Sequence, residues 1–315
     1  MFSREKHKDI LENLHSIRDY IRWAISEMTL QKAYFGHGSE SVWDEAVHLV
    51  LSAINISHDI DSNMISAKLL TEEKSKIVDY VYQRAYKRKP LPYILKKAWF
   101  ADMEFDIDER VIIPRSPIAE LVRNDFSPWI NDVDEISEVL DLCTGSGCIG
   151  IACSDVFEKA DITLVDISDG ALEVARHNIA KHKLNDRVKA IKSDLFNNLE
   201  GKKFDVIVSN PPYVDRDDLA SMPREYHYEP KLALEAGDDG LELAKRIILE
   251  ADQYMTENGV LIVEVGNSQY ALMEMCPDIP FTWLSFSEGG DGVFLLTYAE
   301  LVKYKELFKE YFQKF

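Results

Sequence analysis

Hydrophobic residues change their spacing along the chain near residue 90. From Ser41 to Ile54 the apolar side chains fall on one helical stripe, as they do in a helix that buries a single face. A further helix is predicted to begin at Thr71, whose hydroxyl is expected to cap it, and to end before Pro90, which cannot continue a helix. Residues 1–90 therefore predict a small helical domain.

The stretch from Leu91 to Ile113 has a different pattern. Its apolar residues alternate roughly with acidic ones, which favours a short hairpin that acts as a bridge. Ser116 followed by Pro117 is then typical of a helix start, with a capping residue before a proline at the first helical position.

From Glu138 onward, short apolar runs alternate with helical stretches. The runs are rich in Val and Ile and read EVLDL, DITLVD, RVKAI, FDVIVS and VLIVEV, and helices are predicted over 168–183 and 240–257. Such alternation predicts a mainly parallel sheet covered by helices on both faces. Near the end, FTWLSF and VFLLTY flank the Gly-rich SEGGDG, which predicts an antiparallel pair. Residues 300–315 are amphipathic and are expected to form a helix that packs on this chain.

The net charge of the chain argues against one class of function, nucleic-acid binding. The 315 residues hold 36 basic and 55 acidic side chains, a formal net charge of −19. This acidity argues against a protein that binds nucleic acid through a broad basic face. The one basic run, Arg84, Lys87, Arg88 and Lys89, is expected to be a solvated helix end.

The cysteines and the N-terminal residues indicate where in the cell the protein is expected to act. The four cysteines form no CxxC pair, so no metal site is predicted. No histidine is assigned to metal or acid–base work. The opening MFSREKHKDI is charged where a signal peptide has its apolar core, and no apolar run approaches the ~18 residues of a membrane span. The sequence therefore predicts a cytoplasmic protein with no membrane partner.

A glycine loop, DLCTGSGCIG, follows the first strand of the predicted sheet. Gly145, Gly147 and Gly150 match G-x-G-x-x-G, which lets the backbone approach a nucleotide at a helix N-terminus. The second strand ends in Asp166, and 166 − 147 gives a spacing of 19 residues, suited to a carboxylate that binds two ribose hydroxyls. Asp141 at the first strand would repel a pyrophosphate but tolerate an ammonium or sulfonium group. The loop therefore favours S-adenosylmethionine over a dinucleotide.

The segment Ser193-Asp194-Leu195-Phe196 closes the third strand. Asp194 can accept a hydrogen bond from an adenine amine, and Leu195 and Phe196 can cover the ring. A loop acid beside two core residues explains the same segment equally well.

The segment Asn210-Pro211-Pro212-Tyr213 follows the strand FDVIVS, at the end of the sheet where ligands bind. A planar NH₂ is a poor nucleophile because its lone pair is delocalised. The Asn210 side-chain oxygen and a proline carbonyl can each accept one of its N–H bonds, and the prolines hold these acceptors in place. Tyr213 can pack on the planar group. A structural alternative, in which two prolines only end a strand, leaves this position in the fold unexplained.

With these motifs in order, the chain resembles the class I S-adenosylmethionine-dependent methyltransferases. The flanking AWFADMEFDIDERVIIPRSPIAEL and YHYEPKLALEAGDDGL are similar to the protein-glutamine N5-methyltransferases, and nearest to their branch that modifies the third large-subunit ribosomal protein, uL3. This similarity runs from about Tyr93 to Thr297. Release-factor enzymes usually carry an IPRPET-like segment where residues 113–118 read IPRSPI.

The resemblance implies a fold class, domains and a site. The fold is α/β, a Rossmann-like class I methyltransferase with a mainly parallel sheet and an antiparallel final strand. The domains are a helical substrate-recognition domain at 1–90, a hairpin linker at 91–115 and the methyltransferase domain at 116–315. Cofactor contacts are implied for Thr144, Gly145, Gly147, Cys148, Asp166, Asp194, Leu195 and Asn210. Substrate binding is implied for Asn210, Pro211, Pro212 and Tyr213, with catalysis by Asn210, Pro211 and Tyr213.

The implied reaction transfers a methyl group from S-adenosyl-L-methionine to the side-chain amide of a glutamine in uL3, free or in a ribosome assembly intermediate, and releases S-adenosyl-L-homocysteine. The first alternative is glutamine methylation of release factors. Amino-nucleobase methylation uses similar motif logic, but it needs a grip on DNA or RNA that an acidic chain does not suggest. The basic run at residues 84–89 leaves a local ribosomal RNA contact open.

Two rivals come from other classes. A nicotinamide-dependent oxidoreductase explains the glycines and Asp166 but leaves residues 210–213 without a role. A non-catalytic binding protein does not account for an intact site. Arg115 and Glu264 are candidates to support the site from behind, or to act only in the fold. Asp239 is expected to cap a helix.

Overall fold

The computed structural model describes residues 3–39, 41–57 and 59–313. The chain divides into two compact units, Met1–Lys97 with Pro223–Tyr228, and Ala98–Met222 with Glu229–Phe315. This division differs from the predicted boundaries in two respects. The predicted linker at 91–115 is divided between the two units after Lys97. The short segment at 223–228, predicted to belong to the methyltransferase domain, clusters with the helical unit.

The first unit is helical, as predicted. Its helices are α1 (Arg4–Asn13), α2 (Ile17–Leu30), α3 (Val42–Ala53), α4 (Thr71–Val81) and α5 (Leu91–Leu95), with short turns η1 (Ser62–Ser66) and η2 (Tyr82–Tyr86). Ser41 caps α3 by accepting a hydrogen bond from the backbone N–H of Asp44. The predicted cap at Thr71 is wrong. Leu70 takes that position, and its backbone N–H donates to Glu73 at 2.7 Å.

The predicted solvated basic run is also wrong for two of its four members. Arg84 is 1% exposed and donates to Glu45 and, at 3.1 Å, to Glu225. Arg88 donates to the same carboxylate at 2.7 Å. Glu225 itself is fully buried and accepts a further hydrogen bond from the backbone N–H of Tyr34 at 2.8 Å. Two arginines and two glutamates thus neutralise one another inside the helical unit, where a buried charge needs a partner.

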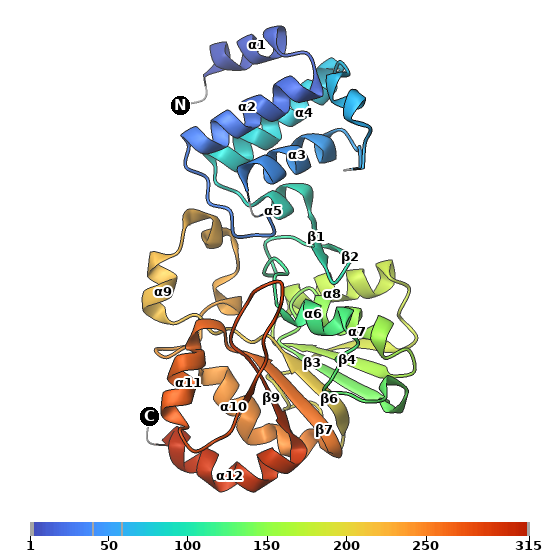
Figure 1. Cartoon of the computed structure of the whole chain (residues 1–315), viewed down its shortest axis with the longest axis vertical. Helices are drawn as coiled ribbons and strands as arrows, with labels where there is room; N and C mark the ends of the chain where they lie inside the picture. Colours follow the sequence, from blue (N-terminus) through green and yellow to red (C-terminus); the bar gives the residue numbers. More distant parts are fainter. Residues whose placement is uncertain (1–2, 40, 58, 314–315) are drawn as a thin grey trace. The chain divides into compact units, whose positions relative to one another are not determined.

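Figure 1 shows the second unit as a sheet with helices on both of its faces. The seven strands run in the order β5-β4-β3-β6-β7-β9-β8. They are β3 (Glu138–Leu142), β4 (Asp161–Asp166), β5 (Val188–Lys192), β6 (Phe204–Ser209), β7 (Met255–Glu264), β8 (Thr282–Trp283) and β9 (Val293–Thr297). Strands β3 to β7 pair in parallel, whereas β9 is antiparallel to both β7 and β8. The predicted fold class is confirmed.

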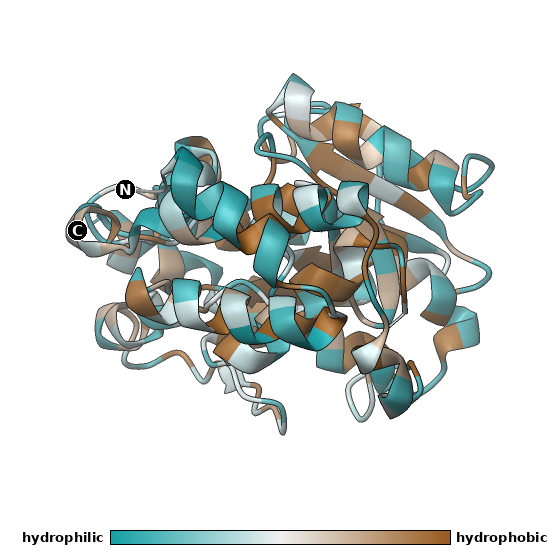
Figure 2. Ribbon diagram, turned by 90° about the horizontal axis from the view of Figure 1, so that it is seen from above, coloured by the Kyte–Doolittle hydropathy of each residue, from teal (hydrophilic) through white to brown (hydrophobic). Residues whose placement is uncertain are grey.

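The helices of this unit are α6 (Ile118–Arg123), α7 (Cys148–Val156), α8 (Asp169–Lys181), α9 (Arg216–Ser221), α10 (Glu242–Glu250), α11 (Gln269–Met275) and α12 (Tyr298–Gln313). Leu301 and Phe308 of α12 are buried in a core shared with α10 and the sheet, so the predicted packing of this helix is confirmed. Figure 2 colours the ribbon by hydropathy and shows hydrophobic residues concentrated in the central strands. The helix predicted over 240–257 ends earlier than expected: α10 ends at Glu250, Ala251–Tyr254 form a 3-10 turn, and β7 begins at Met255.

The predicted hairpin is present but shorter than its segment. It consists of β1 (Lys97–Phe100) and β2 (Met103–Asp106), whereas residues 91–95 form α5. Helix α6 begins one residue later than predicted, and Ser116 accepts a hydrogen bond from the backbone N–H of Ile118 at 3.2 Å. Over the described residues 3–39, 41–57 and 59–313, no helix combines the length and apolar character needed to cross a bilayer.

We predict that Arg84→Met lowers the free energy of unfolding by about 3–5 kcal/mol, because it leaves Glu45 and Glu225 buried with less compensation. Urea denaturation followed by circular dichroism measures this change. The control is Lys8→Met, which breaks the exposed Lys8–Glu12 pair of α1 and is expected to cost less than about 0.5 kcal/mol. Equal effects of the two substitutions would contradict a structural role for the buried pair.

Candidate functional site

The candidate site lies where three neighbouring parallel strands end together. In the sheet register, Leu142 of β3 lies opposite Val165 of β4 on one side and opposite Ser209 of β6 on the other. The residues that follow each strand therefore meet at one edge of the sheet. They are the glycine loop after β3, Asp166 at the end of β4 and Asn210 after β6, which is where open parallel sheets bind ligands.

The glycine loop adopts a conformation that its sequence requires. Gly147 is the N-terminal cap of α7 with φ of 83°, a left-handed value that favours glycine. A methyl group at Gly150 would come within 2.2 Å of Leu164 on β4, so α7 can approach the sheet only with glycine at this position. The backbone N–H of Thr144 also donates to the carbonyl of Val165 at 2.9 Å, which ties the loop to β4.

Asp141 lies beneath this loop rather than in the cavity. It is fully buried, and its Oδ2 accepts hydrogen bonds from the Thr144 hydroxyl and, at 2.9 Å, from the backbone N–H of Gly150. Its Oδ1 has no partner among the described residues. Burial raises the pKa of Asp141 to about 7, against the effect of those two hydrogen bonds. The expected direct influence of Asp141 on a cofactor is therefore replaced by a role in shaping the loop.

Asp166 faces the cavity and is oriented by the backbone. Its Oδ2 accepts a hydrogen bond from the N–H of Gly145 and its Oδ1 one from the N–H of Ser168, both at 2.9 Å. Burial raises the pKa of Asp166, and the backbone hydrogen bonds oppose that rise. Each carboxylate oxygen still has a lone pair for a further donor. The position suits the predicted acceptor of ribose hydroxyls.

A cavity of about 230 Å³ opens at this edge of the sheet. Six of the predicted site residues border it, namely Gly145, Asp166, Asp194, Leu195, Asn210 and Pro212. The other predicted residues, Thr144, Gly147, Cys148, Pro211 and Tyr213, do not border it. Thr144, Gly147, Cys148 and Pro211 are buried.

The segment after β5 forms one side of the cavity. Asp194 borders the cavity and pairs with Arg246 of α10 at 3.0 Å. Leu195 has φ of 48° and also borders the cavity. Phe196, however, is fully buried and stacks on Tyr254 at 4.6 Å between ring centroids. The expectation that Phe196 covers a bound ring is therefore wrong, because its side chain belongs to the core.

Sequence reasoning missed the outer wall of the cavity. Residues 110–112 border it on one side, and Pro230, Leu232 and Ala233 on another. None belongs to a motif, and the only signal for them was the family similarity of the flanking segments. Glu229 joins the two sides of the wall, because it accepts a bidentate pair of hydrogen bonds from Arg115 and one from the backbone N–H of Ile113 at 3.1 Å.

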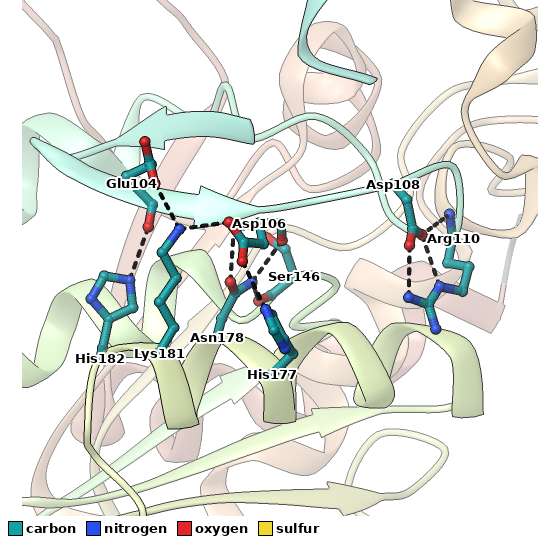
Figure 3. A network of polar contacts seen from close by, with 9 residues as sticks. All are labelled: Glu104, Asp106, Asp108, Arg110, Ser146, His177, Asn178, Lys181 and His182. Carbon is teal, nitrogen blue, oxygen red and sulfur yellow. Dashed lines mark hydrogen bonds and ion pairs between the residues drawn. The ribbon is translucent and has the colours of Figure 1, made fainter. Parts of the chain in front are cut away.

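The hairpin that precedes this wall is fixed on α8 by a polar network (Figure 3). Lys181 pairs with Glu104 at 2.9 Å and with Asp106 at 2.6 Å. Asn178 is fully buried, accepts from the backbone N–H of Asp106 at 2.9 Å and donates to the carbonyl of Ser146 at 2.9 Å. One side chain of α8 thereby joins the hairpin to the glycine loop.

Arg110 continues this network along α8. Its guanidinium group donates to Asp108 at 2.7 Å and 2.8 Å and to Glu173 at 2.7 Å (Figure 3 shows the Asp108 pair). The aliphatic part of the side chain lies against Gly170, where a methyl group would come within 3.3 Å of the Arg110 Cδ. The wall of the cavity at residues 110–112 is thus held in place by contacts to α8.

The chemistry available at the cavity is binding and orientation. Two carboxylates, Asp166 and Asp194, and two guanidinium groups, Arg110 and Arg246, border it together with the Asn210 amide. Val165, Ile167, Leu195 and Leu243 supply apolar surface. Over the described residues, no group of three or more His, Cys, Asp and Glu side chains is arranged to hold a metal ion. Such a site suits a ligand with hydroxyl, amine and apolar parts.

The chain is similar to curated proteins over its whole length. It is 81% identical over 314 residues to the ribosomal protein uL3 glutamine methyltransferase of Francisella tularensis subsp. tularensis, with 100% of both chains covered. It is 39% identical over 290 residues to the ribosomal protein uL3 glutamine methyltransferase of Bordetella pertussis, which covers 92% of this chain and 97% of that one.

The family model of the methyltransferase small domain matches residues 130–223. Among solved structures, the ribosomal protein L11 methylase of Lactobacillus delbrueckii subsp. bulgaricus matches with a TM-score of 0.42 and 18% identity, over 62% of this chain and 88% of that chain.

We predict that Asp141→Asn changes how stability depends on pH. Because the pKa of Asp141 is raised on folding, its protonated side chain stabilises the folded state fully below about pH 4. This stabilisation is lost as the pH rises to about 7. The variant cannot ionise at this position. Its free energy of unfolding relative to the native chain should therefore improve by about 4 kcal/mol between pH 4 and pH 7.5, measured by urea denaturation.

Asp291→Asn, at an exposed position, is the matched control for the loss of one carboxylate. If the difference between native chain and Asp141→Asn stays constant over that pH range, Asp141 does not titrate differently on folding.

Proposed function

We propose that this chain, which belongs to the ribosomal protein uL3 glutamine methyltransferases, binds S-adenosylmethionine in its 230 Å³ cavity and presents a glutamine side chain of uL3 to it at Asn210. One observation carries the proposal. Asn210, Asp166 and the glycine loop come from three separate strand ends and border the same cavity. If the chain were an oxidoreductase, Asn210 would have no role, whereas methyl transfer to an amide requires Asn210 as a hydrogen-bond acceptor.

The residues present fit the proposed methyl donor. Asp166 offers carboxylate oxygens for two ribose hydroxyls, and its backbone hydrogen bonds hold it ready for them. Asp194, held by Arg246, offers an acceptor for the adenine amine beside the apolar side chain of Leu195. The carboxylates of Asp166 and Asp194 also suit the positively charged ammonium and sulfonium groups. When bound, S-adenosylmethionine supplies an electrophilic methyl group.

The proposed work of Asn210 and its neighbours is to orient the amide. The Asn210 side-chain oxygen and the Pro211 carbonyl each accept one N–H bond of the glutamine amide, which turns the nitrogen towards the donor. Pro211 and Pro212 restrict the backbone, so little order has to be imposed when the substrate binds. Tyr213 packs on the planar amide. A strong base is unnecessary, because an amide nitrogen becomes acidic once it is alkylated.

The proposed target is uL3, the protein that both curated relatives are named for. Their whole-length similarity supports uL3 over release factors. The helical unit gives little support to nucleic-acid binding, because Arg84 and Arg88 form ion pairs with buried glutamates. Whether uL3 is methylated alone or during ribosome assembly is a question of substrate rather than of site chemistry. The reaction is proposed to take place in the cytoplasm, where bacterial ribosomes are made.

We predict that Asn210→Ala lowers kcat by at least about a hundredfold, because it removes an acceptor that orients the amide for attack. Turnover is measured with labelled S-adenosylmethionine and unmethylated uL3. Affinity for the cofactor, measured by calorimetry, should fall by less than about tenfold, since Asp166, Asp194 and the glycine loop remain. Wild-type turnover in this variant would remove the segment from the mechanism.

Asp166→Ala is the complementary control. It removes the proposed ribose acceptor but leaves residues 210–213 in place, so cofactor affinity should fall by about tenfold or more. Turnover at saturating cofactor should be affected less than in Asn210→Ala. An unchanged cofactor affinity would contradict the ribose role of Asp166.

A further inference from the structure

Tyr213 is the one residue of the 210–213 segment whose side chain is held by a buried carboxylate. Its hydroxyl donates to Glu264 Oε1 at 2.8 Å. Its backbone carbonyl accepts a hydrogen bond from the Ser268 hydroxyl at 3.1 Å. Burial raises the pKa of Tyr213 far above its usual range, so the hydroxyl stays protonated and can only donate to the carboxylate.

Glu264 occupies the position that allows this contact. It is the last residue of β7, and the register pairs Ser209 of β6 with Val263. Glu264 therefore lies beside the point where the chain leaves β6 to form the 210–213 segment. Its side chain is 4% exposed. A carboxylate at this depth is unfavourable unless donors satisfy it.

Two hydroxyl groups satisfy the two oxygens of Glu264. Tyr213 donates to Oε1, and Ser116 donates to Oε2 at 2.5 Å. Because a carboxylate only accepts, both hydroxyls must direct their hydrogens towards it. Glu264 thereby joins β7, the segment before α6 and the 210–213 segment. The positive charge of Arg115 lies close enough to favour the ionised form of Glu264, whose pKa burial raises.

The backbone around Tyr213 is shaped to admit its ring. A methyl group at Gly266 would come within 2.5 Å of the ring carbon Cε2, and Gly266 has φ of 47°. On the other side, a methyl group at Gly240 would come within 2.3 Å of the Tyr213 carbonyl oxygen. The ring, hydroxyl and carbonyl of Tyr213 are thus each confined by a different contact.

We infer that Glu264 is a positioning residue, which fixes the orientation of Tyr213 and through it the arrangement of the amide acceptors at Asn210 and Pro211. This inference rests on the proposed function, because it takes residues 210–213 as the binding site for the glutamine amide. Glu264 contacts neither cofactor cavity nor substrate in this role. It acts only through Tyr213.

One feature separates this role from support of the cofactor site. Glu264, Ser116 and Tyr213 do not border the cavity, whereas Asp166, Asp194 and Gly145 do. A change at Glu264 should therefore alter how the amide is oriented without altering how the cofactor binds. The expected signature is a lower kcat at an unchanged dissociation constant for S-adenosylmethionine.

The test uses five variants of the full chain with labelled S-adenosylmethionine and uL3. Glu264→Met keeps the side-chain volume but cannot accept a hydrogen bond, and it should lower kcat by about ten- to a hundredfold, as small misplacements of reacting groups do. Tyr213→Phe breaks the same hydrogen bond from its other end and should give a similar loss. Glu264→Gln can still accept from Tyr213 and should recover most of the kcat. In all of them the cofactor dissociation constant should stay within twofold.

Ser116→Ala is the matched control, because it removes the donor on the other oxygen of Glu264 and leaves Tyr213 paired. It should keep kcat within about threefold of the native chain, even where it lowers the melting temperature. The double variant Tyr213→Phe, Glu264→Met should be no slower than the slower single variant, because both single changes break one interaction.

Several outcomes would overturn the inference. These are a native kcat in Tyr213→Phe or Glu264→Met, multiplied losses in the double variant, and a loss in Ser116→Ala as large as that in Glu264→Met. If Glu264→Met does not fold, Tyr213→Phe and Glu264→Gln decide, since a low kcat in the first and a high kcat in the second support the inference. Failure of the proposed function is recognised separately, by native turnover in Asn210→Ala or by no turnover of uL3 in the native chain.

Discussion

Parallel pairing of β3 with β4 and β6 in one register is the constraint on which the site depends. Leu142 is level with Val165 and with Ser209, so the chain leaves all three strands at one edge of the sheet. The glycine loop, Asp166 and Asn210 are brought together by this arrangement although they lie far apart in sequence. A register shift by one residue would reverse the side-chain faces of a strand and separate these groups.

Buried carboxylates then hold the loops that the sheet alone cannot order. Asp141 shapes the glycine loop, Glu229 joins the two sides of the outer cavity wall, and Glu264 joins β7 to Tyr213 and Ser116. In the helical unit, Glu225 accepts from Tyr34, Arg84 and Arg88. Each carboxylate is costly to bury by itself, and each is offset by donors from a different part of the chain. Loops of irregular backbone thereby acquire defined positions.

The sequence predicted what depends on local pattern. Alternating strands and helices indicated the parallel sheet, and the G-x-G-x-x-G spacing with Asp166 predicted a cofactor site at the sheet edge, where Gly145 and Asp166 border a cavity. Features that depend on tertiary contacts could not be predicted from the sequence. Arg84 looks like a surface charge by sequence, and only the fold brings Glu45 and Glu225 to it. Phe196 follows the cavity-lining Leu195 in sequence, but its side chain packs in the core against Tyr254. The local pattern also predicted a helix as far as residue 257, although β7 begins at Met255.

Methyl transfer to a glutamine amide of uL3 is tested by locating the transferred methyl group. The purified chain would be given labelled S-adenosylmethionine with unmethylated uL3, a release factor and DNA in separate reactions, followed by mass spectrometry of each product. We expect one methyl group on a glutamine side-chain nitrogen of uL3. Label only on the release factor or on DNA, or no label on uL3, would contradict it.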